Sequence, residues 1–270
     1  MKNDPRMTII KETFDAVSDE YDSKAHRFFP ESAEYLASLL PSRGDERVLD
    51  VATGTGNAAL ALARRLPQGH VTGVDFSSGM LDQARKKAAA MHIRNVEFLE
   101  MDMQSLEFDA GRFDLATCVF GIFFVEDMEA QLSRIAAKVK PGGTIAICSF
   151  KEDYFRPLQD LMIKRLSNYH VQQPPQPMKR ISTEAGCKAL FEKAGIRNVR
   201  VDQKNMGYFL ENEEEWWNVV WNAGSRRMLS QLQPSDLERF RREHLEEVAA
   251  LKTKDGIWLD VGVLYTIGKK

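Results

Sequence analysis

The spacing of hydrophobic and polar positions changes near residue 47 of the chain. Up to residue 43, apolar side chains recur at helical spacing, as Phe14, Val17 and Tyr21 do, and this predicts amphipathic helices. From Arg47 to Phe150, short apolar runs alternate with helical stretches. Such alternation predicts a parallel sheet with helices on both of its faces.

The apolar runs between residues 47 and 150 predict five strands joined by helices. We expect strands at 48–51, 71–75, 96–99, 113–119 and 144–150, and helices at 57–66, 77–91 and 128–139. Asn57 is the expected N-cap of the first of these helices, and Ser77 or Ser78 that of the second. In the N-terminal helical region, Pro30 and Pro41 are expected to separate the pieces.

The pattern is looser after residue 150. We expect helices at 156–169, 183–194, 213–232 and 234–251, and strands at 197–203 and 257–267. A cluster formed by Pro174, Pro175 and Pro177 is expected to break the chain between the first two helices.

Composition excludes several classes of protein. Of the 270 residues, 43% are hydrophobic and 28% charged, which is ordinary for a globular chain. The 37 basic and 39 acidic residues leave a net charge of −2, which argues against a dedicated nucleic-acid partner or a polybasic membrane surface. The longest uncharged apolar run, Leu115 to Val125, is too short to span a bilayer.

Three widely spaced cysteines, Cys118, Cys148 and Cys187, form no pair typical of a metal site or a disulfide framework. Their number and spacing fit a reducing compartment, and the first residues have no signal-peptide pattern. We therefore expect a cytoplasmic protein with no bound metal.

A glycine-rich turn between a strand and a helix predicts a nucleotide-cofactor site. Gly54-Thr55-Gly56-Asn57-Ala58-Ala59 satisfies the G-x-G-x-x-A form of the dinucleotide fingerprint, and Asp75 follows at the distance of a ribose-binding acid. This loop is therefore also consistent with a nicotinamide-dependent oxidoreductase.

Acids at successive strand ends argue for a different cofactor. Asp50 lies four residues before Gly54, where it would repel a pyrophosphate and attract a cation such as an amine or a sulfonium. Asp75 can accept two hydrogen bonds from a ribose diol. Asp102, after the next strand, can accept one from an adenine amino group. Phe76, Met80 and Met103 are placed by their spacing to enclose an adenine ring.

Four ordered segments, VLDVATGTGNAALALA, VTGVDFSSGMLDQAR, FLEMDMQSLEF and FDLATCVFGIFFVEDMEAQLSRIAAKVKPGGTIAI, resemble the motifs of class I S-adenosylmethionine-dependent methyltransferases. Within this class the chain is most similar to the group of the ubiquinone and menaquinone C-methyltransferases. The segment FDAVSDEYD resembles the one that precedes the core in that group. The resemblance covers roughly residues 10–150 closely and the rest loosely.

The resemblance implies a fold, a cofactor and a reaction. The fold would be a Rossmann-like, doubly wound α/β sheet of seven strands, mostly parallel with an antiparallel last strand at 257–267, plus a helical cap. The cofactor would be S-adenosyl-L-methionine, with S-adenosyl-L-homocysteine as product. Residues 1–270 would form a single domain, with a lid at 1–43, a cofactor-binding core at 44–150 and cap insertions within 151–270.

The resemblance also implies roles at the methionine end of the cofactor. Asp50 would help to hold the ammonium group through water, and Phe120 would approach the methionine portion with its backbone. The backbone of the glycine loop would line the methionine moiety at Ala52, Thr53 and Gly54. In the lid, Tyr21 would touch the cofactor carboxylate or gate the site.

At the nucleoside end, Asp75 would bind the ribose hydroxyls. Phe76 and Met80 would flank the adenine, and Asp102 with Met103 would contact its edge. The chain departs from the family pattern at Ala52, where the first glycine is common.

The acceptor is expected to be a small, partly apolar molecule. Phe120, Phe123 and Phe124 follow the fourth strand and either line an apolar acceptor pocket or belong to the core. Trp217 and Trp221 share a helical face and serve as a substrate wall or as cap packing.

No general base is identified. His26 and His170 lie in segments able to cover the site, so each is a candidate base. Histidines in helices and loops more often have no catalytic role. The absence of an N/D-P-P-Y tetrapeptide after the fourth strand argues against nucleic-acid bases as acceptors. The alternatives are an NAD(P)-dependent oxidoreductase and a non-catalytic cofactor-binding protein, and the chain is expected to be a monomer or a homodimer.

Overall fold

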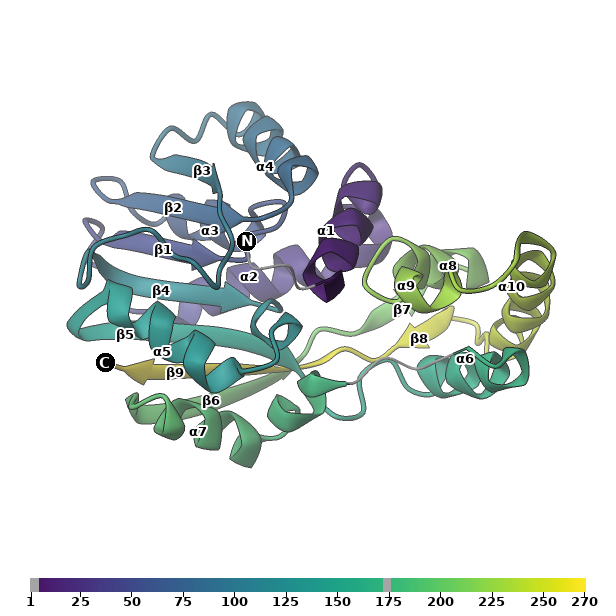
Figure 1. Cartoon of the computed structure of the whole chain (residues 1–270). Helices are drawn as coiled ribbons and strands as arrows, with labels where there is room; N and C mark the ends of the chain where they lie inside the picture. The colour runs from purple at the N-terminus through teal and green to yellow at the C-terminus, as the bar shows by residue number, and fades with distance from the viewer. Residues whose placement is uncertain (1–4, 172–175) are drawn as a thin grey trace.

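A seven-stranded sheet forms the centre of the molecule in a computed structural model that describes residues 5–171 and 176–270 (Figure 1). Its strands lie in the order β3-β2-β1-β4-β5-β9-β6. Their bounds are β1 Arg47–Val51, β2 His70–Asp75, β3 Val96–Glu100, β4 Phe113–Val119, β5 Val139–Phe150, β6 Arg197–Asn205 and β9 Gly262–Lys269. Strands β1 to β5 pair in parallel, and β9 runs antiparallel to both of its neighbours. The predicted fold class is confirmed.

Helices cover both faces of the sheet (Figure 1). One face carries α2, α3 and α4, and the other carries α5 and α7. The helices are α1 Pro5–Val17, α2 Phe28–Leu39, α3 Asn57–Ala63, α4 Ser78–Ala90, α5 Met128–Lys138, α6 Leu158–Leu166, α7 Glu184–Lys193, α8 Glu213–Trp221, α9 Arg226–Leu229 and α10 Pro234–Ala249, with short 3₁₀ turns η1 Lys24–His26, η2 Ile122–Phe124, η3 Ser167–Tyr169 and η4 Pro177–Ile181. A hydrophobic core lies on each side of the sheet.

The start of α3 corrects one expected cap. Gly56, with a left-handed φ of 80°, is the N-cap, and Asn57 is the first helical residue. A Cβ atom on Gly56 would lie 3.0 Å from the Phe98 ring, so the turn has no room for a side chain. Ser77 does cap α4, because its hydroxyl accepts a hydrogen bond from the Met80 amide at 3.2 Å.

The expected last strand is divided in two. Ile257–Leu259 forms β8, which pairs with β7 (Tyr208–Leu210) in a separate two-stranded sheet, and only β9 enters the main sheet. Asp260 lies between β8 and β9, where the chain changes its partner strand. Its carboxylate accepts a hydrogen bond from the side-chain amide of Asn205 at 2.7 Å. A continuous apolar pattern hides such a change of partner.

Two expected helix boundaries also differ. The helix expected at 213–232 is interrupted by residues 222–225, which include Gly224, and continues as α9. Pro30 does not separate helices, because it lies in the first turn of α2, where a missing amide proton is tolerated. Pro174 and Pro175 lie outside the described residues, and Pro177 begins η4.

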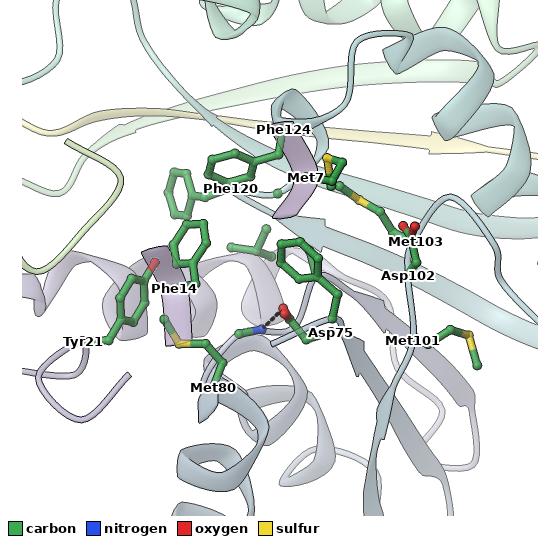
Figure 2. Close-up of a pocket in the computed structure, with 15 residues that line it drawn as sticks. Met7, Phe14, Tyr21, Asp75, Met80, Met101, Asp102, Met103, Phe120 and Phe124 are labelled. Carbon is green, nitrogen blue, oxygen red and sulfur yellow. Dashed lines mark hydrogen bonds between the residues drawn. The ribbon is translucent and has the colours of Figure 1, made fainter. Parts of the chain in front are cut away.

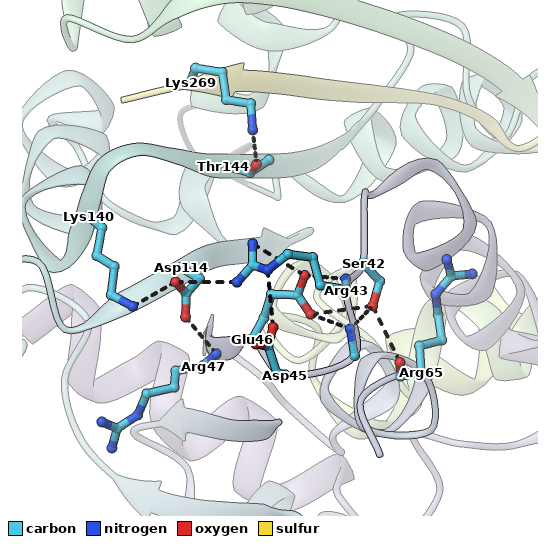
Figure 3. Close-up of polar contacts among 11 residues, drawn as sticks. Ser42, Arg43, Asp45, Glu46, Arg47, Arg65, Asp114, Lys140, Thr144 and Lys269 are labelled. Atoms are coloured by element: carbon cyan, nitrogen blue, oxygen red, sulfur yellow. Dashed lines mark hydrogen bonds and ion pairs between the residues drawn. The ribbon is translucent and has the colours of Figure 1, made fainter. Parts of the chain in front are cut away.

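A polar network fastens the amino-terminal ends of the strands (Figure 3). The buried carboxylate of Glu46 accepts from the backbone amides of Arg43 at 2.6 Å and Gly44 at 3.0 Å. Asp114 accepts from the Arg47 amide at 2.9 Å and from the Lys140 ammonium at 2.7 Å. This edge is therefore held by its own contacts, and the carboxyl ends of the strands lie at the opposite edge.

A cap built from α6, α8, α9, α10 and the small sheet lies beyond the carboxyl ends of the parallel strands, with α1 between the cap and the sheet (Figure 1). Trp216 is fully buried in this cap, and its indole nitrogen donates to His244 at 2.8 Å. None of the helices in residues 5–171 and 176–270 combines the length and apolar character needed to cross a membrane.

Candidate active site

A cavity of about 620 Å³ opens at the carboxyl ends of β1, β2, β3 and β4 (Figure 2). Side chains from α1 and the turn after it close one side, and the glycine loop and the strand ends form the rest. The lining residues are Met7, Phe14, Tyr21, Ala52, Gly54, Asp75, Phe76, Met80, Met101, Asp102, Met103, Val119, Phe120, Gly121 and Phe124.

Most of the site residues expected from the sequence meet in this cavity. The ones that line it are Tyr21, Ala52, Gly54, Asp75, Phe76, Met80, Asp102, Met103 and Phe120. Asp50 and Thr53 do not line it. Their individual roles toward a cofactor remain predictions.

The glycine loop takes its shape from three alternate residues with left-handed backbone conformation. Ala52, Gly54 and Gly56 have φ values of 53°, 55° and 80°, all in the left-handed region. The Gly54 amide donates to the Asp75 carboxylate at 2.8 Å (Figure 2). This bond ties the loop after β1 to the end of β2.

Asp50 lies beneath the glycine loop. Its carboxylate is 1% exposed and accepts from the hydroxyls of Thr53 and Thr117, each at 2.6 Å. Burial raises the pKa of Asp50 to about 6, against the lowering effect of the two hydroxyl bonds. Because Asp50 does not line the cavity, its negative charge can act on a ligand there only through the loop or through water.

Two acids face the cavity directly. Asp75 accepts from the amides of Gly54 and Ser77, the second at 3.0 Å, and burial raises its pKa. Asp102 accepts from the Gln104 amide at 2.9 Å. Among the described lining residues there is no lysine, arginine or histidine. The cavity therefore favours a cationic or hydroxyl-rich ligand over an anionic one.

A second, larger cavity of about 1440 Å³, including its open mouth, adjoins the first. The two share Phe14, Tyr21, Phe120 and Phe124 as lining residues, and we call these four residues the shared wall. Further aromatic side chains line the second cavity, which we call the aromatic cavity: Phe28, Phe29, Phe123, Phe150, Tyr154 and Phe155.

Aromatic rings form a continuous stack from the shared wall into the aromatic cavity. Phe120 and Phe150 are stacked with ring centroids 4.4 Å apart, and Phe150 and Tyr154 with centroids 4.8 Å apart. Sequence reasoning missed Phe150, although it ends the fifth expected strand and so points to the same edge as the other site residues. It also missed Phe28 and Phe29, which enter from α2.

The lid is fastened to the rim of the first cavity by two carboxylates. Asp15 of α1 accepts from the Ser77 hydroxyl at 2.5 Å and the Gly79 amide at 3.2 Å. Asp22 accepts from the Thr55 hydroxyl at 2.9 Å and pairs with the Lys87 ammonium at 2.8 Å. These contacts join the N-terminal segment to the glycine loop and to α4.

The two histidines weighed as bases line neither cavity. His26 is buried with Nδ1 2.8 Å from the Tyr21 carbonyl oxygen and Nε2 3.0 Å from that of Val219, and burial lowers its pKa. His170 is exposed at the end of η3. Trp217 and Trp221 stack on each other at 5.6 Å within the cap and also lie outside both cavities, which fits the packing role.

Comparison with known proteins finds a family model and curated relatives that resemble parts of this chain. Residues 48–143 match the family model described as a methyltransferase domain. The chain is 33% identical over 141 residues to the aklanonic acid methyltransferase of Streptomyces sp. (strain C5), an alignment that covers 52% of this chain and 64% of that protein. It is 29% identical over 221 residues to a demethylmenaquinone methyltransferase of Bacillus cereus, covering 73% of this chain and 91% of that protein.

Solved structures share the fold. The YcgJ protein from Bacillus subtilis superimposes with a TM-score of 0.60 at 21% sequence identity, covering 89% of this chain and 98% of that one. At this level of identity the likeness concerns the arrangement of strands and helices.

Proposed function

We propose that this chain, whose core belongs to the class I S-adenosylmethionine-dependent methyltransferases related to the quinone methyltransferase group, transfers a methyl group to a small, partly apolar acceptor. The cofactor is S-adenosyl-L-methionine, which supplies a methyl group already activated on a sulfonium, and S-adenosyl-L-homocysteine is its product. The acceptor occupies the aromatic cavity.

One observation carries this proposal. The acid-lined cavity and the aromatic cavity meet at the shared wall of Phe14, Tyr21, Phe120 and Phe124. Methyl transfer is an in-line displacement in which donor and acceptor must be held at close range, and fixing that geometry can contribute several kcal/mol. Two adjoining chambers of different polarity suit a polar cofactor on one side and an apolar acceptor on the other.

The residues of the first cavity fit this cofactor. Asp75 accepts the ribose hydroxyls, Phe76 and Met80 flank the adenine, and Asp102 with Met103 contacts its edge. Asp75 and Asp102 carry negative charge in their ionised forms, and this charge favours a positively charged ligand.

The methionine portion lies along the glycine loop. Ala52 and Gly54 present backbone to it, Thr53 joins the loop to Asp50, and Asp50 attracts the ammonium group through water. Phe120 contributes backbone from the end of β4, and Tyr21 gates the passage from the lid.

A nicotinamide dinucleotide fits this cavity poorly. Its pyrophosphate would lie near Asp75 and the glycine loop above Asp50, where like charges repel. No lining residue of the described cavity supplies a compensating cation.

On composition, we propose further that the protein acts in the cytoplasm, without nucleic acid or a metal ion, as a monomer or a homodimer. Its near-neutral net charge of −2 and its three separated cysteines support this assignment.

Replacement of Asp75 tests the cofactor site. Asp75→Asn keeps the size of the side chain but removes the charge that strengthens its hydrogen bonds to hydroxyls. We expect a roughly tenfold or greater increase in the Kd of S-adenosylhomocysteine, measured by calorimetry. Asp82→Asn is the matched control, because Asp82 is exposed on α4 and pairs with Arg85 on the same helix. Equal affinities in the two variants would remove Asp75 from the site.

A further inference from the structure

Among the described residues that line the aromatic cavity, the side chains charged at neutral pH are two arginines. Arg6 and Arg227 line it, and among the described lining residues there is no aspartate, glutamate, histidine, lysine or cysteine. Its remaining ionisable groups are Tyr21 and Tyr154, and burial raises the pKa of both phenols. No described lining residue can therefore act as a general base near neutral pH.

Arg227 is the cation that the fold leaves available to a ligand. It is half-buried on α9, and no carboxylate of the described chain pairs with it. The other arginine, Arg6 of α1, donates from its guanidinium to the Phe124 carbonyl oxygen at 3.4 Å. A guanidinium offers a planar fork of donors that matches a carboxylate or another oxyanion.

The neighbouring arginine provides a natural comparison. Arg226 lies over the Trp221 ring, with its guanidinium carbon 4.6 Å from the ring centroid, and lines neither cavity. The two consecutive arginines of α9 therefore have different surroundings, and only Arg227 faces the aromatic cavity.

The two chambers have opposite charge. Asp75 and Asp102 line the cofactor cavity, whereas Arg6 and Arg227 line the aromatic cavity beyond the shared wall. A cation on one side and an anion on the other are each favoured by the charges that surround them. When the two react, their charges cancel, which an apolar, water-poor chamber favours more than water does.

We propose that the acceptor is an aromatic oxyanion that binds already ionised, with its negative group held by Arg227, and that none of the described lining residues serves as a base. In the transfer step, the nucleophilic atom of the anion forms a bond to the methyl carbon. The carbon–sulfur bond breaks, its electron pair stays on sulfur, and both products are neutral at the reacting atoms. No proton passes to the protein. This inference rests on the proposed methyltransferase function.

The charge preference of the aromatic cavity can be measured with three probes that share one ring system. They are 2-naphthoate, an anion; 2-naphthamide, which is neutral; and 2-naphthylmethylamine, a cation at pH 7.5. Each is titrated calorimetrically into protein saturated with S-adenosylhomocysteine. We expect the naphthoate to bind at least about tenfold more tightly than the amide, and the amine to bind most weakly.

Variants of Arg226 and Arg227 show which side chain causes the preference for an anionic ligand. Arg227→Met is expected to weaken naphthoate binding about tenfold, so that acid and amide bind alike, whereas Arg226→Met keeps the wild-type order. Arg227→Lys, which retains the charge without the fork, is expected to fall between wild type and Arg227→Met.

Several results would overturn this inference. They are equal binding of acid and amide by the wild-type protein, tightest binding of the amine, an equal loss in Arg226→Met, or no binding of any probe at millimolar concentration. Saturation with S-adenosylhomocysteine is verified first for every variant, which also establishes that it folds. Failure of that step in the wild-type protein contradicts the proposed function, whereas a wrong charge order contradicts the anionic acceptor alone.

Discussion

Two residues that line the acid-lined cavity have strained backbone. Ala52 and Phe120 both have φ of 53°, a left-handed conformation that costs a residue with a Cβ atom about 1 kcal/mol or more. Ala52 stands where the resembled family commonly has glycine, and it keeps the conformation that glycine would take. A Cβ on neighbouring Gly121 would lie 2.6 Å from the Ala52 Cβ, so the two loops approach closely here.

Ala52→Gly is therefore expected to relieve strain. We expect the free energy of unfolding, measured with denaturant, to rise by about 0.5–1 kcal/mol, because glycine adopts positive φ without a steric cost. Ala89→Gly is the control. Ala89 is exposed in α4, where glycine should lower stability by about 1 kcal/mol. A loss of stability in Ala52→Gly as large as in Ala89→Gly would show that the left-handed turn stores no strain.

At the residue scale, the sequence predicts which acids meet but not how each is held. Asp75 and Asp102 follow directly from strand ends, because parallel strands end at one edge. The bond from Thr117 to Asp50 joins residues on β1 and β4, and it depends on a strand order that local spacing does not contain. For the same reason, the position of Asp50 beneath the loop could not be predicted from local spacing alone.

At the scale of elements, α1 and the turn after it line the acid-lined cavity and are held there by carboxylates, which supports the predicted lid. Asp22 is the contact that reaches the glycine loop, through Thr55, and it is also paired with the partly buried ammonium of Lys87. Tyr21, next to it in sequence, lines both cavities. Opening of this lid would expose the cofactor, so its contacts should govern how long a ligand stays bound.

Asp22→Asn tests this role of the lid. Loss of the ion pair with Lys87 should raise the dissociation rate of S-adenosylhomocysteine about fivefold, with little change in the thermal stability of the sheet. Stopped-flow fluorescence measures the rate. Glu20→Gln serves as the control, because Glu20 is exposed in the same turn. An unchanged rate in Asp22→Asn would mean that the lid does not limit release.

Elements of the first half of the chain could be predicted closely, and those of the second half less so. Strand β4 has the expected bounds, Phe113–Val119, because its apolar run begins after the polar Gly111-Arg112 and is interrupted by Gly121. The division of 257–267 into β8 and β9 could not be predicted, because both pieces are apolar and only their partner strands differ. The register of α1 over the site is likewise set by tertiary contacts.

At the scale of the whole molecule, the fold separates charges that composition conceals. A net charge of −2 indicates no preference for either sign of ligand, yet the sheet edge gathers acids while α1 and α9 bring arginines to the adjoining chamber (Figure 1). The strand order β3-β2-β1-β4-β5 places the ends of five consecutive strands along one edge. The sequence predicted the cofactor side of this arrangement, but the acceptor side depends on how the cap folds over it.

The central claim is that the acid-lined cavity binds S-adenosylmethionine, and calorimetric titration of the purified chain tests it most directly. S-adenosylhomocysteine is titrated in one series and NAD in a parallel series, under the same conditions. We expect micromolar binding of S-adenosylhomocysteine and no binding of NAD, because Asp50, Asp75 and Asp102 repel a pyrophosphate. Binding of NAD alone would contradict this account and assign the chain to the oxidoreductases.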